Sequence, residues 1–433
     1  MRYACARAFW RRSARGVIDE CIYSCLLPVV QILCKVCPQA GQPCVEEGWL
    51  EAGAKMRDIM LALDPLMGRP VSANQNAWLG NSSILTLQGI DYAPQSYDEW
   101  HANAPLLPAI GSEVSSAYSD RAIAFNDEIG GHVRAYDTEF PAWGNTAQDA
   151  WQSIWSRPFM AGGFSWTGFD YRGEPTPYQW PSVSSHFGIL DAAGFKKDRA
   201  FWYEAWNVQP RPPVLHLFPH WNFVAGQIID VWAYSNAEEV ELFLNGASLG
   251  RSACGNHSHA AWPAIAWQAG ELRAVAYFSA APSEAVATAM VRTTGPPKKL
   301  RLSIKDGVGA EGVCANGRDV ALVQVEIVDA RGDLVPYADT LIEFAVDGGE
   351  TVLQILGTGN GDPSCHVPDR SKVRPAFGGR VMAVLQSTAA GAEHGAKIVV
   401  RARAPADAGV ASDALELMMR TCEPSSGCTM LEL

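Results

Sequence analysis

The sequence predicts a multidomain α/β plus all-β protein, in which an α/β portion with parallel strands precedes two β-sandwiches. Before Asn207, segments with apolar residues at helical spacing alternate with short apolar strands. This alternation is typical of a parallel sheet or a (β/α) barrel. After Asn207, the proline-rich stretch 210–213 leads into segments with a period of two. That period indicates antiparallel β-structure.

The α/β portion is expected over residues 44–208. Helices are predicted over residues 49–63, 97–103, 146–157 and 198–206. Strands are predicted over residues 69–73, 85–92, 106–113 and 159–166. In a fold of this kind the loops that follow the strands converge at one edge, so this edge is where we look for a site.

Two β-sandwich domains are expected over residues 209–295 and 296–421, with residues 422–433 as a tail. In the first sandwich, the strand 240–244 ends in Asn245-Gly246, a pair that favours a two-residue hairpin turn. The second sandwich repeats the pattern of short strands with glycine-rich turns between them.

Residues 1–43 form a cysteine-rich segment without a domain assignment, and six of the eleven cysteines fall within the first 44 residues. The cysteines have a spacing that superficially resembles that of zinc ligands, but no pattern of a known zinc module follows in the sequence, so no metal site is predicted. Arginines precede the apolar stretch 21–33, as in a signal sequence, but no cleavage motif follows. The stretch is also too short to span a bilayer. Localisation is therefore left open, secretion included.

The charge and the aromatic content favour a neutral carbohydrate as partner. The formal net charge is -12 and no cluster of lysine and arginine is present, which argues against a nucleic-acid partner. Seven of the fifteen tryptophans lie between Trp143 and Trp206. Flat aromatic faces suit sugar rings, although core packing explains most of these residues. No cofactor is implied, and no oligomeric state is predicted.

A carboxylate ends the buried strand 106–113. Glu113 follows the small residues Gly111 and Ser112, which leave room for a ligand at the strand end. Taken alone, a glutamate in this place is equally often a member of a structural ion pair. Hydrolysis of a glycosidic bond needs two carboxyl groups, held roughly 5 Å apart in retaining enzymes. Glu46 and Glu47, directly before the first helix, could supply the second carboxyl group. The alternative is an acidic first turn favoured by the helix dipole, which we prefer for Glu47.

Four further side chains follow the predicted strand ends. Tyr92 is expected to hydrogen-bond the nucleophilic carboxylate, and Trp166 to provide a platform for a sugar ring. Asp170 and Tyr171, on the loop after Trp166, are candidates to bind sugar hydroxyls. For each of the four, ordinary packing or loop hydrogen bonding is the alternative explanation.

Gly111-Ser-Glu113 is followed by the run FMAGGFSWTGFDYRGEPTPYQWP over residues 159–181 and by the segments 187–191 and 198–203. Together these closely resemble the glycoside hydrolase family 2 beta-galactosidases, from about Glu46 to the end of the second sandwich. The resemblance implies the C-terminal half of a (β/α)8 TIM barrel followed by two immunoglobulin-like β-sandwiches. It also implies Glu113 as nucleophile and Glu46 as acid/base.

The sequence departs from this family in two places. The acid/base normally follows an asparagine that helps to bind the sugar, but Val45 stands here and has no such hydrogen bond to offer. Residues 1–43 show no resemblance, and an alternative start, a shifted reading frame or a genuine replacement would each explain this, of which we favour the first two. Two hypotheses follow. One is a retaining beta-galactosidase or related beta-glycosidase, and the other is an inactive remnant that binds carbohydrate or serves a structural role.

Overall fold

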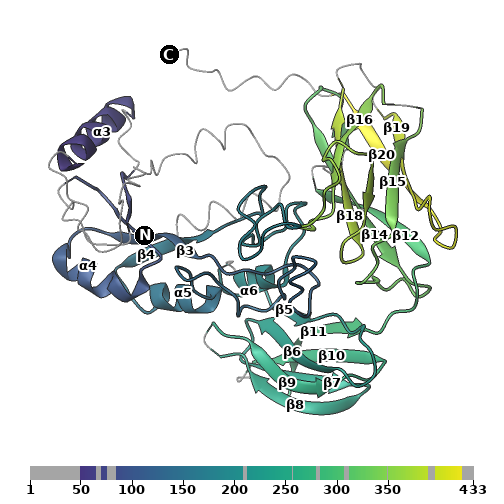
Figure 1. Ribbon diagram of the computed structural model, residues 1–433, viewed down its shortest axis with the longest axis horizontal. Helices are drawn as coiled ribbons and strands as arrows, with labels where there is room; N and C mark the ends of the chain where they lie inside the picture. Colours follow the sequence, from purple (N-terminus) through teal and green to yellow (C-terminus); the bar gives the residue numbers. More distant parts are fainter. Residues whose placement is uncertain are drawn as a thin grey trace.

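The computed structural model describes residues 49–64, 70–75, 84–207, 212–255, 257–278, 283–306, 312–348, 350–388 and 395–421. Within these residues an α/β region is followed by two all-β regions (Figure 1). The predicted acid/base Glu46, its neighbour Val45, the cysteine-rich segment 1–43 and the tail 422–433 lie outside the described residues.

The α/β region is built on a four-stranded parallel sheet with the order β1-β2-β3-β4. Its strands are β1 (Asn74–Gln75), β2 (Gln88–Asp91), β3 (Ala109–Ser115) and β4 (Met160–Trp166). Its helices are α3 (Trp49–Leu63), η1 (Pro94–Ser96), α4 (Tyr97–Asn103), α5 (Ala147–Trp155) and α6 (Asp198–Asn207). Parallel neighbours need a crossover between them, and α4 lies in the connection from β2 to β3 and α5 in the connection from β3 to β4.

Helix α5 shows how the sequence sets this region. The Thr146 side chain accepts a hydrogen bond from the Asp149 backbone N–H at 3.0 Å, which caps the start of the helix. One face of α5 then buries Ala150 and Ile154 in the same apolar core as Val114 of β3. The helix is therefore held against the sheet by the same apolar side chains that form its core.

The first predicted strand was misplaced. Residues 70–73 do not form a strand of the sheet, and β1 begins at Asn74. Val71 is instead held by Thr86, whose side-chain oxygen accepts from the Val71 N–H at 2.6 Å. The remaining predicted strands and helices of this region are present: the helices 49–63 and 97–103 have the predicted bounds, and the ends of the others are shifted.

The second region consists of two antiparallel sheets with the orders β11-β10-β7-β8 and β5-β6-β9. Its strands are β5 (Leu215–Phe218), β6 (Ile228–Ser235), β7 (Glu239–Leu244), β8 (Ala247–Ala253), β9 (Ala260–Ala266), β10 (Glu271–Tyr277) and β11 (Ala285–Arg292). The predicted hairpin is confirmed, because Asn245 and Gly246 join β7 to β8 with φ values of 50° and 85°. Side chains from both sheets share one apolar core around Trp221 and Trp262.

The third region has sheets with the orders β12-β14-β18-β16 and β13-β20-β19-β15-β17. Its strands are β12 (Lys299–Asp306), β13 (Val313–Cys314), β14 (Val320–Val328), β15 (Leu341–Val346), β16 (Leu353–Gly359), β17 (Val373–Pro375), β18 (Arg380–Ser387), β19 (Lys397–Arg403) and β20 (Asp413–Arg420). The inward-facing residues of both sheets form one core. Each all-β region is thus a two-layer sandwich.

The third region contacts the α/β region through the loop 360–369. Arg121, which is buried, donates to the Asn360 carbonyl oxygen at 2.8 Å, and His132 pairs with Asp362 at 3.0 Å. Arg172 reaches Asp369 at 2.7 Å. These contacts hold the C-terminal sandwich against the loops that follow β3 and β4.

Among the helices that the structure describes, none is long and apolar enough to cross a membrane.

Candidate active site

Three neighbouring strands bring the predicted site residues to one edge of the sheet. Tyr92 follows the last residue of β2, Glu113 lies near the end of β3, and Trp166 ends β4. In the strand register Asp91 pairs with Glu113 and Ser115 pairs with Trp166. Because the carboxyl ends of parallel strands meet at the same edge, residues far apart in the sequence become neighbours here.

The Tyr92 hydroxyl is hydrogen-bonded to the Glu113 carboxylate. It also accepts a hydrogen bond from the Ser116 Oγ at 2.6 Å, and the Tyr92 backbone N–H donates to the Glu113 carbonyl oxygen at 3.0 Å. Burial raises the pKa of Tyr92 far above its ordinary value, and the charges of Glu113 and Asp91 add to this effect. The phenol therefore keeps its proton and remains a donor to the carboxylate at neutral pH.

A pocket of about 410 Å³ opens beside Tyr92. One wall is formed by Asp91 and Tyr92 at the end of β2, and the other by the loop 142–145 with Trp143. The backbone of this loop is tied to the end of β3, where the Asn145 N–H donates to the Ser115 carbonyl oxygen at 2.8 Å. An aromatic wall opposite polar groups is the usual character of a small-molecule site.

Trp166 and Tyr171 form a second polar and aromatic group beyond β4. The Trp166 indole N–H donates to the Tyr171 hydroxyl at 3.1 Å, and this hydroxyl donates to the Glu174 carboxylate in a short hydrogen bond. Burial raises the pKa of Tyr171 above its ordinary value, with the Glu174 charge acting in the same direction. Glu174 was not among the predicted site residues, although it lies within the run 159–181 that carries the family resemblance.

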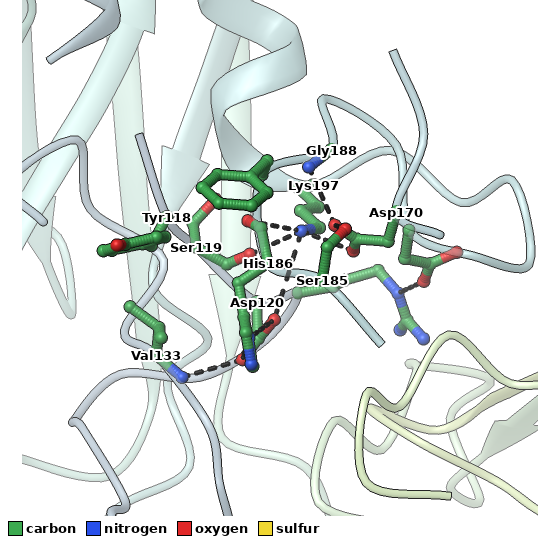
Figure 2. A network of polar contacts seen from close by, with 12 residues as sticks. Tyr118, Ser119, Asp120, Val133, Asp170, Ser185, His186, Gly188 and Lys197 are labelled. Atoms are coloured by element: carbon green, nitrogen blue, oxygen red, sulfur yellow. Dashed lines mark hydrogen bonds and ion pairs between the residues drawn. The ribbon is translucent and has the colours of Figure 1, made fainter. Parts of the chain in front are cut away.

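The side chain of Asp170 is buried in the protein, unlike that of its neighbour Tyr171, which lies at the edge of the site. Asp170 is 6% exposed, and its carboxylate pairs with the Lys197 ammonium at 2.6 Å and accepts from the Gly188 N–H at 2.8 Å (Figure 2). Both carboxylate oxygens are therefore directed at protein groups. The Asp170 carboxylate anchors the loop that presents Tyr171, and the structure does not bring it to the exposed side where Glu174 lies.

A buried polar network extends inward from Asp170 (Figure 2). The Lys197 ammonium donates to the Ser119 carbonyl oxygen at 2.6 Å and lies 4.0 Å from the Asp120 carboxylate. Asp120 in turn contacts the His186 Nδ1 at 2.8 Å. Burial acts to raise the pKa of Asp120, but His186 and Lys197 outweigh burial and lower it. The network joins the connection that follows β3 to the connection that follows β4.

Comparison with known proteins identifies the class of protein. Residues 304–408 match glycoside hydrolase family 2 C-terminal domain 5, and residues 226–281 match a domain of unknown function (DUF4982). The chain is a relative of the glycoside hydrolase family 2 proteins and resembles their C-terminal part.

Among its relatives is the beta-galactosidase BoGH2A of Bacteroides ovatus, which is 36% identical over 358 residues, or 77% of this chain and 40% of the relative. A putative beta-glucuronidase of Formosa agariphila is 33% identical over 251 residues, or 56% of this chain and 23% of the relative. The chain thus spans less than half the length of these relatives.

Solved structures share the fold. A beta-glycosidase from Bacteroides vulgatus has a TM-score of 0.70 at 24% identity, covering 88% of this chain and 49% of that protein. A glycosyl hydrolase family 2 member from Bacteroides cellulosilyticus has a TM-score of 0.68 at 23% identity, covering 86% of this chain and 47% of that protein. These similarities extend across the described regions and support the fold alone.

Proposed function

We propose that this chain carries the nucleophile side of a retaining beta-glycosidase that acts on terminal beta-galactosides or related beta-glycosides. The observation that carries the proposal is the Glu113 carboxylate at the end of β3, hydrogen-bonded by Tyr92 from the neighbouring strand end. A carboxylate in this place is oriented and kept available for attack. The beta-galactosidase and beta-glucuronidase names of the relatives support a beta-glycoside as the substrate class.

The architecture that fits this function is the C-terminal half of a (β/α)8 TIM barrel. The sequential order of the four parallel strands, with α4 between β2 and β3 and α5 between β3 and β4, supports this architecture. The two sandwiches that follow are proposed to be immunoglobulin-like domains, of which the second contacts the strand-end loops through residues 360–369.

The reaction proceeds in two displacements. Glu46 protonates the leaving oxygen while Glu113 attacks the anomeric carbon and forms a glycosyl-enzyme. Glu46, now a carboxylate, takes a proton from water, and the resulting attack on the anomeric carbon releases the sugar and frees Glu113. Tyr92 orients Glu113 throughout by its hydrogen bond.

The remaining site residues bind and position the sugar. Trp166 offers an aromatic face, and Tyr171 offers its hydroxyl oxygen beside it. Asp170 supports these two residues indirectly, because its pairing with Lys197 holds the loop in place.

Hydrolysis of an aryl beta-galactoside by the purified 433-residue chain and its Glu113→Gln variant tests the proposal. The variant is expected to lose turnover by about 10³-fold or more, because no glycosyl-enzyme forms without the carboxylate. Glu99→Gln removes a carboxylate from the exposed face of α4 and is the matched control, with activity unchanged. Equal activity of the Glu113→Gln variant overturns the proposal. A folded chain that binds sugar and hydrolyses no aryl glycoside favours a carbohydrate-binding protein instead.

A further inference from the structure

Glu174 occupies an unusual backbone position at the edge of the candidate site. Its φ is 47°, in the left-handed region, and it follows Gly173 with a φ of 86°. This conformation is unfavourable for a residue with a side chain, and positions of this kind cluster at ligand-binding sites. The side chain is nevertheless exposed. Packing in a core therefore cannot be the reason for a side chain at this position.

The hydrogen bonds of Glu174 leave it open to a ligand. One carboxylate oxygen, Oε2, accepts from the Tyr171 hydroxyl, which itself accepts from the Trp166 indole N–H. Tyr171 has a single O–H, so its donor is fully used by Glu174. Among the residues that the structure describes, Tyr171 is the hydrogen-bond partner of this carboxylate, and Oε1 keeps its lone pairs. Held in this way, Glu174 is oriented to accept hydrogen bonds from hydroxyl groups.

The charges around the site are negative. Burial raises the pKa of Tyr118 to about 12, and Glu174 is the charged group that acts with it. For Tyr92 the corresponding charges are those of Glu113 and Asp91. Two cations of the connection that follows β4 are engaged in ion pairs, Arg172 with Asp369 and Lys197 with Asp170.

A ligand carboxylate placed beside Glu174 would therefore meet a like charge, and Arg172 and Lys197 are already paired with other carboxylates. Close like charges in a partly desolvated site disfavour each other, whereas a neutral sugar brings hydroxyl donors to the same oxygens.

We propose that Glu174 is a specificity-determining residue, which accepts hydrogen bonds from the hydroxyls of a neutral hexoside and excludes a uronic acid. This inference rests on the proposed function, because it assumes that the sugar lies beside Trp166 and Tyr171. Glu174 contacts the non-reacting part of the sugar and takes no part in the transfer itself.

Binding of two ligands that differ only in a carboxylate tests this inference. Methyl beta-galactopyranoside and methyl beta-galacturonide are titrated into the full chain by calorimetry, with tryptophan fluorescence as a second readout. The native chain is expected to bind the neutral glycoside at least about 10-fold more tightly. Glu174→Gln removes the charge, weakens the neutral ligand and strengthens the uronide. The ratio of the two dissociation constants then falls on the order of 10-fold.

Two further variants make the result specific. Glu99→Gln leaves the ratio unchanged, since this carboxylate lies on the exposed surface of α4. Tyr171→Phe removes the hydrogen bond that orients Glu174 and lowers the ratio part of the way, with circular dichroism as the check on folding.

Three results overturn the inference. They are a ratio unaffected by Glu174→Gln, a native chain that binds the uronide as tightly as the neutral glycoside, and a native chain that binds neither. A chain that shows the expected preference but never hydrolyses either ligand's aryl counterpart defeats the proposed hydrolysis and leaves the role of Glu174 standing.

Discussion

Two groups of ionisable side chains lie in the α/β region. One group is paired with opposite charges, and the other is hydrogen-bonded to neutral hydroxyls. In the buried group, Lys197 pairs with Asp170 and lies near Asp120, which contacts His186. In the open group, the carboxylates of Glu113 and Glu174 hydrogen-bond to tyrosine hydroxyls. A tyrosine donor orients a carboxylate without neutralising it.

This difference separates groups that hold the structure from groups that are available for chemistry. A buried charge is tolerated because its partner is in place, and the removal of one partner leaves the other uncompensated. A carboxylate bonded to a neutral hydroxyl retains its charge and lone pairs for a ligand. Substitutions in the buried group should therefore act on stability, and substitutions in the open group on turnover and binding.

The largest stability effect is expected for Lys197→Met. The variant leaves Asp170 buried without its cation and removes one of the two groups that offset the burial of Asp120, which is expected to lower the free energy of unfolding by about 3–5 kcal/mol. Urea denaturation followed by tryptophan fluorescence measures it. The adjacent Lys196→Met is the control, because the Lys196 side chain is 39% exposed and its pair with Glu204 contributes less than about 1 kcal/mol. Equal losses in both variants would contradict the distinction between the two groups.

Local sequence patterns predicted the fold well where a single segment decides the outcome. The Asn245-Gly246 hairpin and the capped helix α5 follow from residues that lie next to each other. The start of β1 was mispredicted because Val71 is held by Thr86, a side chain fifteen residues away. Contacts such as that of Arg121 with the Asn360 carbonyl, across 239 residues, have no local signal at all.

The same reasoning explains what the sequence missed in the candidate site. Strand ends indicated Tyr92, Glu113 and Trp166, because the polarity of a residue that follows an apolar strand is visible in the sequence. Asp170 was grouped with Tyr171 because they are adjacent, but its partner Lys197 lies beyond the reach of any local pattern. Glu174 was overlooked because its left-handed backbone and its bond to Tyr171 appear only in three dimensions.

A smaller effect is expected for Tyr92→Phe in the open group. Loss of a hydrogen bond to a charged group is worth about 1.5–3 kcal/mol, so kcat is expected to fall by on the order of 10-fold to 100-fold. The hydrogen bond favours the ionised carboxylate, so the acidic limb of the pH–rate profile should also move to higher pH.

The control for this variant is Tyr337→Phe in the C-terminal sandwich, where the hydroxyl is exposed and donates to the Gly295 carbonyl oxygen. Its rate and pH profile should match those of the native chain. A Tyr92→Phe variant with an unmoved pH profile would show that Tyr92 only packs against the strand end.

The smallest effect is expected for the pair of His132 and Asp362, which joins the α/β region to the C-terminal sandwich and lies between the two groups in exposure. Burial lowers the pKa of His132, but the hydrogen bond and charge of Asp362, with Asp120 and Asp127, outweigh burial and raise it above 6.5.

Because the folded pKa exceeds the unfolded one, the pair stabilises the fold fully below pH of about 6.5 and loses this contribution as the pH rises through the folded value. Between pH 6 and pH 8 the free energy of unfolding of the native chain should therefore fall by up to about 1 kcal/mol more than that of the His132→Gln variant. Parallel urea titrations of both proteins at the two pH values measure this difference. Asp362→Asn should abolish most of the same pH dependence, since it removes the main partner of the imidazolium. If the native chain and both variants share one pH dependence, the contact between the two regions is maintained by packing, such as that of His132 on Phe377, rather than by charge.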